Sequence, residues 1–269
     1  MPWSYEHLNW LTDTDQTITT VCGKQAKVYH FEYDITDHST MKKWAKHFRN
    51  HYCSDAEIAI LKAPHQDTSE YLINMKFPSR SIAPGPSIRA GDFAEILVAD
   101  YLERFKKFDV PRTRYDRKAV PNESTKGSDV IAFKLAPDNS DNDELLVFEV
   151  KAKLTGKSKD MLQEAIDHSA KDELRLAESL NGMKQRLWDR KELKKVELVT
   201  RFQNPVDQPY RQTYGAAAVC SSSVFDPSVL SGADSSKHPH HQDLELITFH
   251  GEELMELVHA LYELAANEI

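Results

Sequence analysis

One short segment constrains the fold of this chain more than any other part of its sequence. Leu145 to Ala152 is apolar at almost every position until its end, which is the pattern of a central strand buried on both faces. Such a strand needs helices packed on each side of its sheet. Residues 129–135 are typical of a neighbouring strand, and the polar stretch 137–143 is typical of a turn between the two. These patterns predict a hairpin inside a mixed α/β core.

Hydrophobic periodicity on both sides of this hairpin predicts the rest of the core. We expect a sheet of four or five of the candidate strands, with the late ones parallel to their neighbours. The expected further strands are residues 27–33, 71–77, 212–221 and 244–249, with a short one at 112–116. The expected helices are residues 39–52, capped by Asp37 or Ser39, then 91–105, 160–180, 183–199 and 251–267.

A Pro-, Ser- and Gly-rich stretch at residues 78–86 indicates a boundary between two parts of the chain. Residues 1–85 are expected to form a smaller N-terminal α+β region. Residues 86–269 are expected to form a larger α/β domain that contains the buried hairpin. The N-terminal region carries none of the chemistry described next, so it is the candidate for binding a partner.

Charged side chains stand at the end of the buried strand. Glu149 and Lys151 are two residues apart, so they leave the same face of the strand, while Val150 points the other way. Burial of two charges rarely adds stability, because desolvation offsets most of their attraction. Asp129 begins the preceding strand, and a hairpin would bring it to the Glu149 end. This placement favours a functional site over an ordinary solvated strand edge.

Two acidic side chains in this arrangement suit Mg²⁺ or Mn²⁺, which prefer oxygen ligands and retain several waters. Asp129 and Glu149 are therefore the expected ligands. Lys151 beside them would position a water molecule and stabilise negative charge that grows on a phosphate group. The sequence thus predicts a phosphate-directed, metal-dependent site.

Four segments carry a resemblance to a known family. An Asp followed by Glu-x-Lys on adjacent strands resembles the active site of the PD-(D/E)xK nuclease superfamily. Together with residues 89–95, 127–129, 148–153 and 162–172, it resembles the HamA family, the nuclease subunit of Hachiman-type antiphage systems, and its relative AbpA. The resemblance covers about residues 85 to 265. It implies a restriction-endonuclease-like mixed sheet flanked by helices.

The resemblance also implies roles for particular residues and for a partner. Glu95, from the helix before the hairpin, would supply a further acid to the metal site, and the carbonyl of Val150 an additional ligand. The alternative for Glu95 is an acidic residue favoured by a helix N-terminus. The partner implied is a superfamily 2 helicase, called HamB in Hachiman systems, in a heterodimer that acts on DNA.

Contacts with nucleic acid are predicted more weakly. Arg112 and Arg114 precede Asp129, Lys153 follows the Glu-x-Lys strand, and Gln163 corresponds to a DNA-contacting Gln of some superfamily members. An ordinary helix surface is the alternative for Gln163. The net charge of −8 disfavours strong autonomous binding to a polyanion, which again points to a partner.

Composition narrows the class of protein further. No run of apolar residues approaches the length of a membrane span, and the three cysteines form no CxxC pair. We therefore expect a cytoplasmic protein. The hypothesis is a Mg²⁺-dependent DNA endonuclease within an antiviral helicase–nuclease complex. The alternative is a non-catalytic adaptor that keeps the nuclease fold to bind a helicase or to sense DNA.

Overall fold

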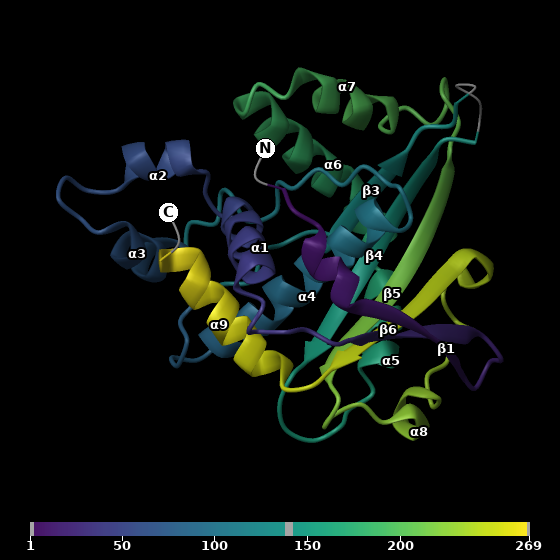
Figure 1. The fold of residues 1–269 in the computed structure, drawn as a ribbon. Helices are drawn as coiled ribbons and strands as arrows, with labels where there is room; N and C mark the ends of the chain where they lie inside the picture. The colour runs from purple at the N-terminus through teal and green to yellow at the C-terminus, as the bar shows by residue number, and fades with distance from the viewer. Residues whose placement is uncertain (1–2, 138–141, 268–269) are drawn as a thin grey trace.

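A single mixed sheet forms the centre of the computed structural model, which describes residues 3–137 and 142–267 (Figure 1). The described residues form six strands in the order β1-β2-β6-β5-β4-β3. Neighbours among β2, β6, β5 and β4 are parallel, and the edge strands β1 and β3 are antiparallel to theirs. The bounds are β1 Leu11–Thr19, β2 Gln25–Phe31, β3 Val130–Lys134, β4 Glu144–Lys153, β5 Arg211–Ser221 and β6 Leu244–Gly251.

Helices cover both faces of this sheet, as the buried β4 requires. One face packs against α1 (His38–Asn50), α4 (Gly85–Arg104) and α9 (Leu254–Asn267). The other packs against α5 (Met161–Ser169), α6 (Asp172–Asp189), α7 (Leu193–Arg201) and α8 (Pro227–Leu230). The short elements are η1 (Glu6–Trp10), α2 (Asp55–Leu61), α3 (Thr68–Tyr71), the π-helical turn η2 (Leu72–Lys76) and η3 (His241–Asp243). The expected α/β class is confirmed.

The strand beside β4 has the small residues that close packing of the sheet requires. A Cβ atom at Gly215 in β5 would lie 2.1 Å from the ring of Phe148 in β4. Glycine at this position therefore leaves room for the Phe148 ring, which is completely buried. The Phe148 ring therefore holds β4 against β5 at the position directly before Glu149.

The sheet contains six strands, more than the four or five expected. β1 was missed because it is a polar edge strand, exposed at most of its positions. The strand expected at 71–77 is wrong, since these residues form the end of α3 and then η2. Asp67 accepts hydrogen bonds from the backbone N–H groups of Ser69 and Glu70 and so starts the helix. Residues 112–116 lie in the described part of the chain and form no strand.

The two helices expected at 160–180 and 183–199 are three helices in the structure. α5 ends at Ser169, and α6 begins at Asp172 and runs to Asp189. Lys191 then adopts a left-handed conformation with φ of 59°, which separates α6 from α7. The polar turn expected at 137–143 lies partly outside the described residues, but β3 and β4 form the expected antiparallel pair.

Residues 1–85 contribute directly to the central sheet. β2 pairs with β6, and α1 packs against α9 in the same hydrophobic core as α4. Strands from both sides of the boundary expected near residue 85 therefore belong to the same sheet. Within residues 3–137 and 142–267, no helix is both long enough and apolar enough to cross a lipid bilayer.

Candidate active site

The end of the β3–β4 hairpin brings together the first three predicted site residues. Val130 pairs with Phe148, so Asp129 falls opposite Glu149. Asp129 Oδ2 accepts a hydrogen bond of 3.0 Å from the backbone N–H of Val150. Because the N–H and C=O of one strand residue point to the same side, the Val150 carbonyl faces the same edge. The strand register thus gathers two carboxylates and a backbone oxygen.

Glu149 and Lys151 form an ion pair on the α5 face of β4. Only 8 % of the Glu149 side chain is exposed, against 21 % for Lys151. Burial lowers the pKa of Lys151, but the carboxylates of Glu149 and Asp129 outweigh it and raise the pKa overall. Lys151 is therefore protonated, and its ion pair with Glu149 holds the ammonium in place. His168 of α5 places Nδ1 3.4 Å from Glu149 Oε1.

Glu95 reaches the same edge from α4. The helix begins at Gly85, so Glu95 lies in its middle, and the alternative of an N-terminal acid does not apply. Its carboxylate accepts a hydrogen bond from the Tyr115 hydroxyl and contacts Arg114. Burial raises the pKa of Glu95, while the Arg114 guanidinium lowers it by favouring the ionised carboxylate.

Arg114 connects Glu95 to Asp129. Its Nη2 lies 2.6 Å from Asp129 Oδ1 and 3.4 Å from Glu95 Oε1. Burial lowers the pKa of Arg114, but the two carboxylates outweigh it and raise the pKa overall, so the guanidinium stays charged. Sequence reasoning placed Arg114 near the cleft as a weak DNA contact. The structure places it inside the carboxylate group.

Arg114 belongs to a series of ion pairs between residues 112–118 and α4. Lys118 lies 2.9 Å from Asp92, Arg114 contacts Glu95, and Arg112 lies 2.6 Å from Asp100. The two segments therefore run in opposite directions, with these three basic side chains each facing an acid of α4. The sequence contains acidic residues spaced along 92–103 and basic residues at 112, 114 and 118. These two sets could be paired only once the two segments were known to lie side by side.

The remaining predicted nucleic-acid residues have internal partners or lie at the margin of the site. Arg112 is 6 % exposed and paired with acids of α4, so its side chain faces the core, not a DNA groove. Gln163 donates to Asp167 and to the carbonyl of Asp234, and accepts from the N–H of Asp234 at 2.6 Å. It therefore fixes the loop after α8. Lys153 is half-buried at the end of β4.

A family model described as HamA matches residues 6–265. The chain belongs to the HamA family. The match begins well before the resemblance recognised in the sequence, so it includes β1, β2 and α1. Membership fits a component of Hachiman-type antiphage defence. No match was found among curated proteins or among solved structures.

The residues of this HamA-family site fit a hard divalent cation by their donor chemistry. Asp129, Glu149 and the Val150 carbonyl would hold the ion. Glu95 is linked to Asp129 through Arg114, and in the described structure the oxygens of Glu95, Asp129 and Glu149 do not all lie within 4.8 Å of one another. The carboxylates are neutralised here by cations of the chain itself: Arg114 bridges Glu95 and Asp129, and Lys151 pairs with Glu149. A divalent ion at Glu95 and Asp129 therefore has to share or replace the contacts of Arg114.

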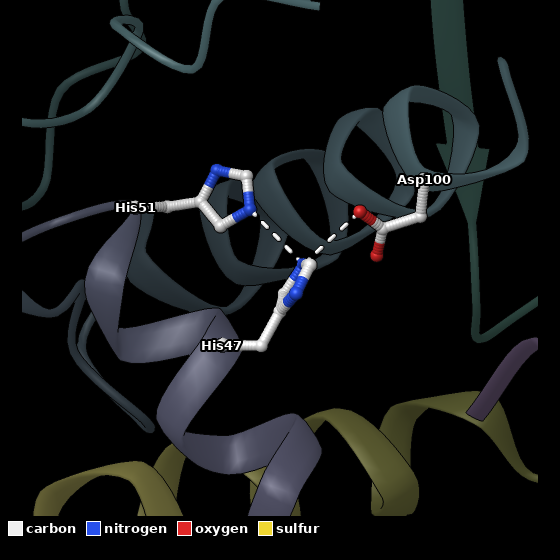
Figure 2. A group of neighbouring side chains, drawn as sticks. All are labelled: His47, His51 and Asp100. Carbon is white, nitrogen blue, oxygen red and sulfur yellow. Dashed lines mark hydrogen bonds and ion pairs between the residues drawn. The ribbon is translucent and has the colours of Figure 1, made fainter. Parts of the chain in front are cut away.

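A second group of possible ligands is buried around another cation of the chain. His47 of α1, His51 directly after α1 and Asp100 of α4 are the described residues whose ligand atoms cluster within 4.8 Å (Figure 2). Arg112 places Nη1 2.8 Å from His51 Nε2 and Nη2 2.6 Å from Asp100 Oδ1. His47 Nδ1 accepts from the N–H of Ser4, and its Nε2 lies 3.0 Å from Asp100. A guanidinium thus already supplies the cation of this buried network.

Proposed function

We propose that this chain is a metal-dependent DNA endonuclease, the nuclease subunit of an antiviral helicase–nuclease complex. The observation that carries the proposal is the convergence of Asp129, Glu149 and Lys151 at the open end of a buried hairpin. Two carboxylates and one ammonium at such a position match the needs of phosphodiester hydrolysis. HamA-family membership supports the same conclusion.

Each side chain has a distinct task in this proposal. Asp129 is held against β4 by the Val150 N–H and would use its carboxylate to hold the metal. Glu149 presents the second carboxylate and orients Lys151, whose ammonium aligns the attacking water and stabilises charge on the pentavalent phosphate. A bound Mg²⁺ would supply Lewis-acid activation of the phosphate and a lower pKa for its water.

Cleavage of supercoiled plasmid tests the proposal. The purified chain, alone and with its helicase partner, is incubated with plasmid in Mg²⁺ or in EDTA. We expect Mg²⁺-dependent nicking or linearisation that EDTA abolishes, and faster cleavage with the partner, because the net charge of −8 gives the chain alone little attraction for DNA. An intact plasmid under all conditions would favour the alternative function of a non-catalytic adaptor.

Metal binding should stabilise the folded protein. A ligand that binds only the folded state raises the melting temperature, so Mg²⁺ or Mn²⁺ is expected to do so in the wild type. Asp129→Asn should abolish most of this shift by removing one ligand. Thermal unfolding by differential scanning fluorimetry measures both shifts. An equal shift in the variant would place the ion elsewhere.

The proposed helicase contact lies in the N-terminal region. Five large apolar side chains of residues 60–82 are exposed, and Figure 1 shows α2 and α3 away from the sheet, with α3 beside the end of α9. We name these side chains the arm patch: Ile60, Leu61, Ile73, Met75 and Ile82. Exposed large apolar side chains are candidates for a protein interface.

Charge introduced into the arm patch should weaken the heterodimer. Deleting residues 1–80 is unsuitable because it would remove β1, β2 and α1 from the core. Ile60→Glu with Ile73→Glu is expected to lower helicase affinity at least ~10-fold by burying unpaired carboxylates at the interface. Val206→Glu, at another highly exposed position, is the control. Biolayer interferometry measures the helicase affinity of the wild type, the double variant and the control. Unchanged affinity of the double variant would show that the interface lies elsewhere.

A further inference from the structure

The further inference concerns Arg114, which makes a dense set of contacts inside the candidate site. Besides Glu95 and Asp129, its guanidinium donates to the carbonyls of Ser128 at 2.6 Å, and of Gly127 and Thr125 at 3.3 Å. Only 16 % of its side chain is exposed, with 13 % of Glu95 and 10 % of Asp129. Arg114 is thus a built-in cation of this site and not a surface contact for DNA.

The electrostatics of the pair explain why a cation is needed there. Glu95 and Asp129 are two largely buried carboxylates that contact the same guanidinium, and like charges in a desolvated site repel. A guanidinium between them offsets this repulsion. A divalent cation would offset the same repulsion through the same oxygen atoms, so the two cations compete for one pair of carboxylates.

The surroundings of Arg114 give its side chain room to leave. Arg114 lies on the segment between α4 and β3, where residues 111–128 form no helix or strand within the described chain. It borders two cavities, of about 70 Å³ and 170 Å³, that lie on the sides of Ser179 and of Lys118 respectively. A guanidinium that left Glu95 and Asp129 could therefore move without repacking the sheet.

We propose that Arg114 competes with the divalent cation for Glu95 and Asp129, and that its withdrawal admits the ion. The chain then rests in a self-neutralised, metal-poor state, and any contact that draws residues 112–118 away from α4 raises its metal affinity. The inference rests on the proposed function, because it takes the carboxylates to be metal ligands.

Calorimetric titration with Mn²⁺ tests the competition directly. Arg114→Gln should bind Mn²⁺ ~10-fold more tightly than the wild type, within the usual range of coupling between two sites. Arg117→Gln removes the same charge from an exposed position three residues further on, and should bind as the wild type does. Equal or weaker binding by Arg114→Gln would overturn the proposal and make Arg114 an organiser of the ligands.

A second measurement covers the case in which Arg114→Gln does not fold. Hydrogen exchange of the wild-type chain is followed with and without saturating Mn²⁺. Displacement of Arg114 removes its hydrogen bonds to the carbonyls of Thr125, Gly127 and Ser128 and so loosens this segment. Amide exchange at residues 117–128 should therefore increase, while exchange in β5 should stay the same. Unchanged or slower exchange at 117–128 would contradict the displacement.

These measurements are independent of cleavage. Tighter Mn²⁺ binding by Arg114→Gln, with no cleavage of plasmid by either protein, would support the competition and defeat the nuclease function. Mg²⁺-dependent cleavage with unchanged Mn²⁺ affinity would do the reverse. The two proposals can therefore fail separately.

Discussion

Lys151→Ala is expected to slow plasmid cleavage by ~10²–10³-fold, because loss of one preorganised group directed at a reacting phosphate typically has this effect. Lys151 is not a metal ligand in the proposed site, so Mn²⁺ binding should remain nearly intact. Lys153→Ala, two residues further along β4 on the same face, is the matched control, and we expect a much smaller effect. Initial rates of plasmid cleavage by the complex under Mg²⁺ give the comparison.

Glu149→Ala should be at least as damaging, since it removes both a ligand and the partner of Lys151. The fold should survive both changes, because Phe148 and Val150 remain to pack β4 in the core. Gel filtration with the helicase checks this point. If both variants cut DNA as fast as the wild type, the active site is misplaced and the adaptor function becomes the better interpretation.

Asp100→Asn is expected to lower the free energy of unfolding by ~3–5 kcal/mol, the usual cost of removing one partner from a buried ion pair. Asp100 is fully buried and lies 2.6 Å from Arg112, 3.0 Å from His47 and 2.9 Å from His7. Without its charge, the Arg112 guanidinium keeps only Glu103 as an acidic partner. Urea unfolding measures the loss.

The control for this variant is Asp55→Asn. Asp55 pairs with Arg49 and Lys46, but it is 54 % exposed, so less than ~1 kcal/mol should be lost. A similar small loss for Asp100→Asn would show that the network adds nothing to stability.

Acid should expose the same contribution of Asp100. Burial raises the pKa of Asp100, but His47 and Arg112 lower it by more than burial raises it. The folded-state pKa therefore lies well below the ordinary value. A carboxyl group with a depressed folded-state pKa stabilises the folded protein at pH values above its unfolded-state pKa of about 4. This stabilisation is lost as the pH falls from about 4 through the folded-state pKa. The unfolding free energy of the wild type should therefore fall more steeply below pH 4 than that of Asp100→Asn.

The sequence alone determined the class of the fold and the position of the candidate site. The continuous apolar run of β4 requires cover on both faces, whatever the rest of the chain does, and this gave an α/β core. The period of two along a strand placed Glu149 and Lys151 on one face and Val150 on the other. A short connection between two strands allows only an antiparallel hairpin, so Asp129 had to lie near Glu149. These are local rules that need no distant contact.

Tertiary structure decided the rest, because the remaining features depend on segments far apart in the chain. β1 is polar and takes its place only by pairing with β2, while residues 71–77 alternate like a strand but are directed by the Asp67 cap and by packing on α9. The pairing of residues 112–118 with α4 moved Arg112 into the core and Arg114 between Glu95 and Asp129. Which acid neutralises which base follows from the path of the chain in space, and no spacing along the sequence encodes it.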